Sequence, residues 1–305
     1  MKNMLLIGLL MLSKSRLHAC DICGGVSGNA SIGLFASSSF HMMGLKTQTQ
    51  VFASYLNGIR HSQEIIFRND LNFRMQITKR LQVMAMVPYQ YAWQLRDLGS
   101  DFKSGLGDPL VMGNVILFHK KDTSGITKHF VSGALGVKFP LGKYGSNESS
   151  LMNLYPGTGG FDGLVMMNYT KGWNKGWSFQ NEASWSIKSA NPNGYRYGNV
   201  LQLSTLFLKN QKWQLMRIIP AFGFQFNHFK RSSINGQILN ESNNSGYTFS
   251  GKIALNVMTY KWLLGISSQI PFLQNVNSGI TKQFFGAEIS CTYLLKSKKS
   301  KNEKE

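Results

Sequence analysis

Two cysteines near the start of the chain have the most evident capacity for chemistry. Cys20 and Cys23 stand in the stretch LHACDICGG, directly after an apolar run. The pair can form a disulfide in an oxidising compartment, and Cys20 can carry a lipid, because Leu-x-Ala-Cys is close to a lipoprotein signal. Two thiolates can also bind a soft metal ion, although two ligands do not complete a site. Unpaired thiols are the fourth alternative; haem attachment is excluded, because Gly24 stands where C-x-x-C-H needs His.

A second group of residues could hydrolyse an ester. His61 lies beside Ser62 and close to Glu64, and an outer-membrane lipase or protease needs a set of this kind near one rim of its barrel. Exposed residues in a loop explain the same three positions, so we expect no enzyme. The sequence has no Gly-rich phosphate loop and no zinc spacing, and we expect no cofactor and no metal.

The composition favours a β-rich protein with an apolar exterior. The 305 residues include 33 Lys and Arg against 14 Asp and Glu, a formal net charge of +19. Such a balance is typical of chains that bind nucleic acid or anionic lipid. Charged residues nevertheless make up only 15% of the chain, below the roughly 25% of soluble domains. No aromatic residues are interleaved with a basic helix, so we expect no nucleic-acid partner and interpret the tail, residues 296–305, as a solvated basic end.

The first nineteen residues resemble an export signal. Lys2 precedes the apolar run Met4–Leu12, and the polar exit ends at Ala19; the run is too short to span a bilayer. We therefore expect a signal peptide over residues 1–19 and a periplasmic N-terminal segment with the C-x-x-C over residues 20–43. Residues 30–43 within that segment could plug a lumen or form an extra strand.

From about residue 45 the apolar residues recur with a period of two, which indicates β-strands. In Ile65–Ile77, for example, the apolar side chains fall on one face and the polar ones on the other, with Asn69 as the exception. Twelve strands are predicted, near residues 45–55, 65–77, 82–95, 109–119, 128–139, 161–171, 176–188, 197–208, 211–226, 246–259, 261–271 and 283–295. The intervening gaps alternate between wide and narrow, with wide ones at 56–64, 96–108, 140–160, 189–196, 227–245 and 272–282. Long loops on one rim and tight turns on the other are typical of an outer-membrane barrel.

The predicted fold is therefore all-β: an antiparallel up-and-down transmembrane β-barrel of about twelve strands over residues 44–295. In lipid a spanning sheet must close, so that the apolar face meets lipid and the polar face lines the lumen. Mixed charges in a narrow lumen can simply pair with one another, or they can form a constriction that selects solutes by size and sign. The predicted pore-lining residues are Arg68, Asp70, Arg74, Lys138, Glu182, Lys188, Lys252 and Glu288.

One short motif has a more specific appearance. Gly105-Leu106-Gly107-Asp108-Pro109 predicts a tight re-entry from a loop into a strand, because glycine allows positive φ, Asp caps a turn, and Pro can begin a strand without its N–H. Together with Val-Pro-Tyr and Phe-Pro-Leu-Gly at the strand ends, this motif resembles the outer-membrane channel family named for the MetA pathway of phenol degradation, which is distantly similar to FadL-type channels. The Cys-Asp-Ile-Cys-Gly start resembles members of that family from Bacteroidetes.

The resemblance covers roughly residues 44–295, and it implies passive passage of small molecules, hydrophobic or aromatic ones among them, across the outer membrane of a Gram-negative bacterium. The expected partners are a small-molecule solute, outer-membrane lipid and lipopolysaccharide. A barrel with a structural or lipase-like role is the alternative, and a soluble β-sandwich is the alternative fold. The resemblance does not identify a substrate, because no binding residues of the family match here position by position.

Overall fold

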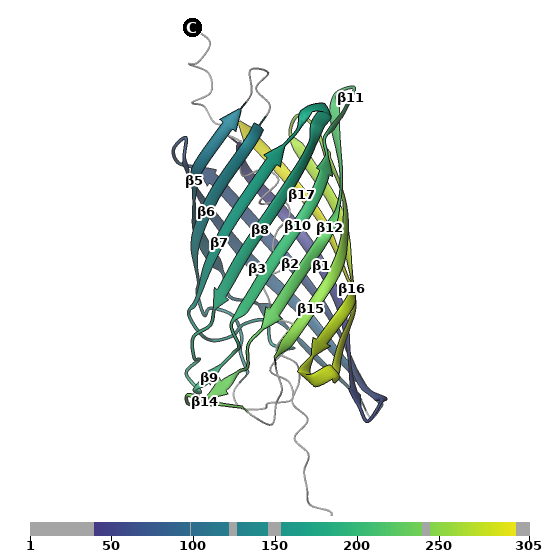
Figure 1. Cartoon of the computed structure of the whole chain (residues 1–305). Helices are drawn as coiled ribbons and strands as arrows, with labels where there is room; N and C mark the ends of the chain where they lie inside the picture. Colours follow the sequence, from purple (N-terminus) through teal and green to yellow (C-terminus); the bar gives the residue numbers. More distant parts are fainter. Residues whose placement is uncertain (1–39, 98, 122–126, 146–153, 240–244, 297–305) are drawn as a thin grey trace, which may run out of the picture.

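The computed structural model describes residues 40–97, 99–121, 127–145, 154–239 and 245–296 (Figure 1). The long strands of this part are β1 (Phe40–Leu56), β2 (Ile59–Gln76), β3 (Leu81–Arg96), β4 (Gly99–Leu106), β5 (Leu110–Lys121), β6 (Thr127–Lys138), β7 (Asp162–Gly172), β8 (Trp177–Ile187), β10 (Val200–Lys209), β12 (Met216–Phe229), β15 (Gly246–Met258), β16 (Trp262–Val276) and β17 (Thr281–Lys296). None of the helical segments in these ranges has the length and apolar composition of a transmembrane helix.

The strands form one closed antiparallel barrel, as the sequence predicts. Successive long strands pair with each other except β4 and β5, β1 pairs with β17, and β10 pairs directly with β12, which also pairs with the short strand β11 (Gln211–Trp213). β4 and β5 both pair with β3 and together occupy one position in the barrel, so that twelve positions are filled in the described part of the chain. The sheet thus closes on itself, which a sheet in lipid requires.

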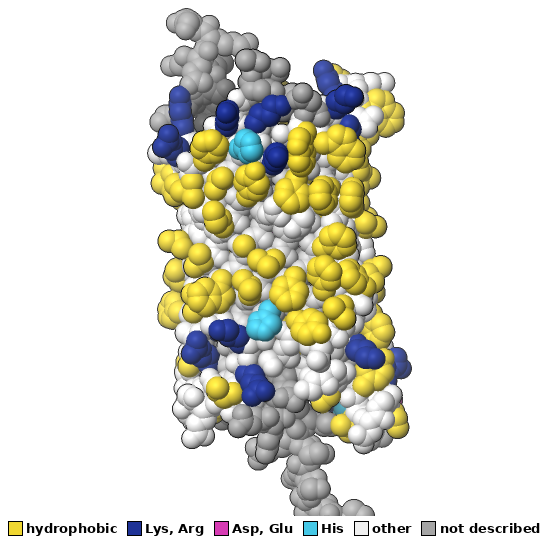
Figure 2. Space-filling model, viewed as in Figure 1, with side chains coloured by type: hydrophobic (Ala, Val, Ile, Leu, Met, Phe, Trp, Pro, Cys, Tyr) yellow, Lys and Arg dark blue, Asp and Glu magenta, His cyan; other side chains and the backbone are white. Residues whose placement is uncertain are grey.

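Buried and exposed residues alternate along the strands, and the exposed ones are mostly apolar. In β8 the exposed residues include Trp177, Trp185 and Ile187, while Gln180, Glu182 and Ser184 are buried. Figure 2 shows the result as a broad band of hydrophobic side chains around the barrel, with Lys and Arg at both ends. Asn69, the polar exception on the outer face of β2, accepts a hydrogen bond from Thr47 Oγ1 at 2.7 Å.

Three of the six predicted wide loops are tight turns instead, and the strands beside them are longer than expected. Asn57 and Gly58 have φ values of 51° and 81° and join β1 to β2, the signature of a two-residue hairpin turn. Similarly, β3 ends at Arg96 and β4 begins at Gly99, and a short 3-10 turn, Asn277–Gly279, joins β16 to β17. Alternation continues into these hairpins, which therefore extend the barrel wall beyond the predicted strand ends.

The Gly105–Pro109 motif lies inside the wall rather than at the end of a loop. Gly105 belongs to β4, and residues 107–109 interrupt the strand before β5 begins at Leu110. Pro109 cannot donate a hydrogen bond to a neighbouring strand. The side chain of Asp108, in the interruption before β5, points into the barrel. The predicted wide loop at 96–108 is consequently wrong, because most of it is β4 paired with β3.

The remaining long connections gather at one rim, shown at the lower end of Figure 1. They carry a small sheet of β9 (Tyr195–Arg196), β13 (Ser233–Ile234) and β14 (Gln237–Ile238). We call this end the loop-side rim. The opposite end, where β1 begins and β17 ends, is the turn-side rim. β1 begins at Phe40, so residues 40–43 are part of the barrel, whereas Cys20, Cys23 and residues 30–39 lie outside the described residues.

Candidate channel lumen

All eight predicted pore-lining residues lie on the inner side of the barrel wall or just beyond it. Asp70, Arg74, Glu182, Lys188 and Lys252 are buried, and Arg68, Lys138 and Glu288 are partly buried. They come from β2, β6, β8, β15 and β17, with Lys188 directly after β8. The structure brings four of them into two ionic groups, Arg68 and Asp70 into one, and Lys138 and Lys188 into the other.

The first ionic group lies on β1 and β2. Asp70 is fully buried, and its carboxylate contacts Lys46 Nζ at 3.3 Å and Arg68 Nε at 2.6 Å. Burying a charge is costly unless it is paired and hydrogen-bonded, and here two cations enclose one carboxylate. Lys46 was absent from the predicted set, although it lies directly across from Asp70 in the β1–β2 register.

The second ionic group lies near the loop-side rim. The carboxylate of Asp162 contacts Lys138 Nζ at 2.5 Å and Lys188 Nζ at 3.0 Å, and Lys138 Nζ also lies 3.3 Å from the carboxylate of Asp108. Burial, and to a smaller extent the Lys138 ammonium, lowers the pKa of Lys188 to about 8, while Asp162 opposes this shift. At neutral pH the group therefore holds two cations and two carboxylates in contact.

The pKa of Lys188 gives a testable pH dependence. As the pH rises from 7 to 9, Lys188 loses its proton, so the group loses one positive charge. We expect the preference of the pore for cations over anions, measured as a reversal potential in a salt gradient, to increase over this range. Lys188→Gln should remove most of the pH dependence; an unchanged dependence in that variant would show that another group titrates.

Asp108 fastens the connection between β6 and β7 inside the barrel. Its carboxylate accepts hydrogen bonds from the backbone N–H of Gly142 at 3.0 Å and of Thr158 at 2.7 Å, and from Thr158 Oγ1 at 2.9 Å. The close approach depends on glycine, because a Cβ at Gly142 would lie 2.7 Å from the carbonyl carbon of Gly107. We call residues 139–145 and 154–161 the inward loop.

Leu154 of the inward loop lies inside the barrel. Leu154 is 1% exposed and belongs to an apolar cluster whose other members come from six strands, namely Phe52, Ile66, Ala92, Val200, Phe229 and Val276. Gln90 Nε2 also donates to the Leu154 carbonyl at 3.4 Å. An apolar cluster that joins the inward loop to residues of six strands narrows the lumen at this level.

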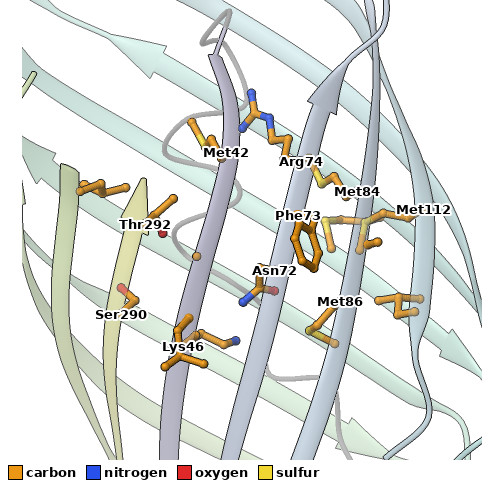
Figure 3. A pocket seen from close by; sticks show the side chains of 16 residues that line it. Met42, Lys46, Asn72, Phe73, Arg74, Met84, Met86, Met112, Ser290 and Thr292 are labelled. Carbon is orange, nitrogen blue, oxygen red and sulfur yellow. The ribbon is translucent and has the colours of Figure 1, made fainter. Parts of the chain in front are cut away.

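Between this constriction and the turn-side rim, one wall of the lumen is apolar and rich in methionine. Met84 and Met86 of β3, Met112 of β5 and Met166 of β7 form a buried cluster with Leu110, Ala134 and Leu164. A cavity beside this methionine wall is also lined by Lys46 and Arg74. In Figure 3 the labelled methionines and these two cations extend from neighbouring strands around the same cavity. The lumen is thus amphipathic, whereas the sequence predicts a polar one.

The residues that could form a hydrolytic set do not come together. Ser62 and Glu64 face the inside of β2, where Ser62 Oγ donates to Glu64 at 2.6 Å, whereas His61 is exposed on the outside. Adjacent residues of a strand point to opposite faces, which separates the imidazole from the hydroxyl. Cys291 is exposed on the outer face of β17. The described residues include no group of three or more His, Cys, Asp or Glu that could hold a metal ion.

Comparisons with known proteins find likeness in fold. No protein-family model matches the sequence, and no curated protein matches it. An outer membrane channel from Pseudomonas putida F1 superposes with a TM-score of 0.62 at 15% identity, over 84% of this chain and 96% of that chain. The β domain of the Bordetella autotransporter BrkA superposes with a TM-score of 0.54 at 9% identity, over 84% of this chain and 99% of that chain. Together with the closed wall and the apolar exterior, this likeness places the chain in a bacterial outer membrane.

Proposed function

We propose that the chain is an outer-membrane channel for the passive passage of small solutes, including hydrophobic and aromatic ones. The observation that carries the proposal is the amphipathic cavity, where the methionine wall lies beside Lys46 and Arg74. Thioethers are flexible and polarisable, and they make favourable contacts with aromatic rings. A wall of this kind can accept apolar molecules of different shapes, while the charged side keeps the lumen wet.

Membership in the family named for the MetA pathway of phenol degradation forms part of the same proposal. The Gly105–Pro109 motif supports it, and so does the similarity in fold to an outer membrane channel. In this chain the aspartate of the motif attaches the inward loop. A channel of this family would use that attachment to set the width of its pore.

Partial block of ionic current in a planar bilayer tests the proposed solute class. We expect a small neutral aromatic alcohol to block the current at lower concentration than a sugar of similar size. Replacing Met84 and Met112 by Gln keeps the side-chain length but removes two sulfur–aromatic contacts, each worth about 0.3–1.5 kcal/mol. We therefore expect block by the aromatic to weaken about threefold to a hundredfold and block by the sugar to stay unchanged.

The matched control replaces Met75 and Met216 by Gln, because both are exposed on the outside of the barrel. That variant should behave like the parent protein. If the purified protein carries no current and admits no solute into liposomes, the channel proposal fails. If the aromatic and the sugar block equally in the parent protein, passage of solutes stands but the preference for aromatic ones fails.

A further inference from the structure

The turn-side rim is basic throughout the part of the chain that the structure describes. Its strand ends and turns carry Lys79, Arg80, Lys120, Lys121, Lys128, Lys171, Lys175, Lys209, Lys212, Arg217 and Lys261. The described Asp and Glu residues all lie elsewhere, inside the barrel or near the turn between β3 and β4. Figure 2 shows Lys and Arg side chains as dark blue patches near the upper end of the barrel on the face in view.

Within this rim three lysines and two tryptophans form a compact cluster. Lys171 Nζ lies 5.4 Å from the centre of the Trp173 ring, and Lys209 Nζ lies 4.9 Å from that of Trp177. Lys209 Nζ also donates to the carbonyl of Lys175 at 2.7 Å. β7 and β8 are joined by the turn that contains Trp173 and Lys175, and β8 pairs with β10, so all five residues are neighbours.

The two tryptophans fix the depth of the cluster in the membrane. Trp173 is 40% exposed and Trp177 is 45% exposed, both at the end of the apolar band. Indole rings at such positions lie at the level of the lipid headgroups. Ammonium groups stacked on these rings are therefore held where phosphates lie, on the outside of the barrel rather than in its mouth.

We propose that Lys171, Lys175 and Lys209, with Trp173 and Trp177, bind the phosphate of an anionic phospholipid in the periplasmic leaflet. The turn-side rim faces the periplasm because barrels of this class have short periplasmic turns and long external loops. Charge decides the class of lipid: three cations without a described acidic neighbour favour phosphatidylglycerol, which has a net charge, over phosphatidylcholine, which has none. Each Lys near an anionic surface strengthens the attraction about fivefold.

Quenching of tryptophan fluorescence by brominated lipids tests this site directly. The protein would carry Phe in place of Trp93, Trp185, Trp213 and Trp262, leaving only the two tryptophans of the cluster. In vesicles that mix the two lipids, with one brominated at a time, we expect phosphatidylglycerol to be preferred about tenfold or more at low salt. Lys171→Gln, Lys175→Gln and Lys209→Gln together should reduce this preference to about one.

The control replaces three exposed cations of the loop-side rim, Arg60, Lys230 and Lys282, by Gln. This control variant removes the same net charge as the triple lysine variant and should keep the preference for phosphatidylglycerol. The proposal fails if both brominated lipids quench the fluorescence of the protein with the intact cluster equally. It fails as well if the triple lysine variant keeps the preference for phosphatidylglycerol. It also fails if the control variant loses as much, because net charge rather than the cluster would then attract the lipid. Heat-modifiable migration on gels would show that each variant is folded.

Discussion

Asp108→Ala should open the channel, raising its single-channel conductance severalfold. The carboxylate holds two backbone N–H groups and one hydroxyl of the inward loop, and it contacts Lys138. Removing one partner of a buried charge pair costs about 3–5 kcal/mol of stability. Because Asp108 holds the inward loop, its removal should weaken the contact between this loop and the barrel wall. Leu154 would then leave its apolar cluster, and the constriction at that level would widen.

Two further variants separate release of the loop from damage to the barrel. Asp101→Ala removes a carboxylate of β4 that is paired with Arg96 at 3.2 Å and is about one-third exposed. It should leave conductance unchanged. Gly142→Val adds a side chain where even a Cβ would lie 2.7 Å from the backbone of Gly107; it should raise conductance without changing any charge. Unaltered conductance in both Asp108→Ala and Gly142→Val, with barrels that migrate as folded, would mean that the inward loop does not limit the pore.

The inward loop also illustrates what the sequence could not predict. Asp108 and Thr158 are fifty positions apart, and no local pattern marks them as partners. The motif around Asp108 indicates a break in regular structure, and the sequence predicts that the aspartate caps a turn there. Its partners in the structure belong to another connection, because β5 and β7 both pair with β6 and this pairing brings Asp108 close to the connection between β6 and β7.

The sequence predicts which side chains point into the barrel only where a strand has one polar and one apolar face. In β2 and β8 polar and apolar residues alternate, and the structure places Asp70 and Glu182 inside, as their patterns indicate. In β3 both faces are apolar near the turn-side end: Val83 and Ala85 point outward, while Met84 and Met86 point inward. The alternation of polar and apolar residues cannot identify the inward face there. The sequence therefore does not predict the methionine wall and predicts a polar lumen instead.

A charged residue in the middle of the outer face should be far more damaging than the same residue outside the membrane. Ile253 lies near the middle of β15 and is 65% exposed, opposite Phe222 of β12. Ile253→Lys should lower the free energy of unfolding in lipid vesicles by about 2–4 kcal/mol, the cost of Lys at the midplane of a barrel. The measurement is urea-induced unfolding, followed by the loss of heat-modifiable migration.

Ile238→Lys is the matched control, because Ile238 is 59% exposed but lies in the small sheet at the loop-side rim. In water an exposed Ile gains nothing from its apolar surface, so replacing it by Lys should change the unfolding free energy by less than about 0.5 kcal/mol. A soluble sandwich would tolerate both substitutions equally, since both side chains would face water. The difference between the two variants therefore measures the lipid environment of β15 itself, independently of any solute that passes through the barrel.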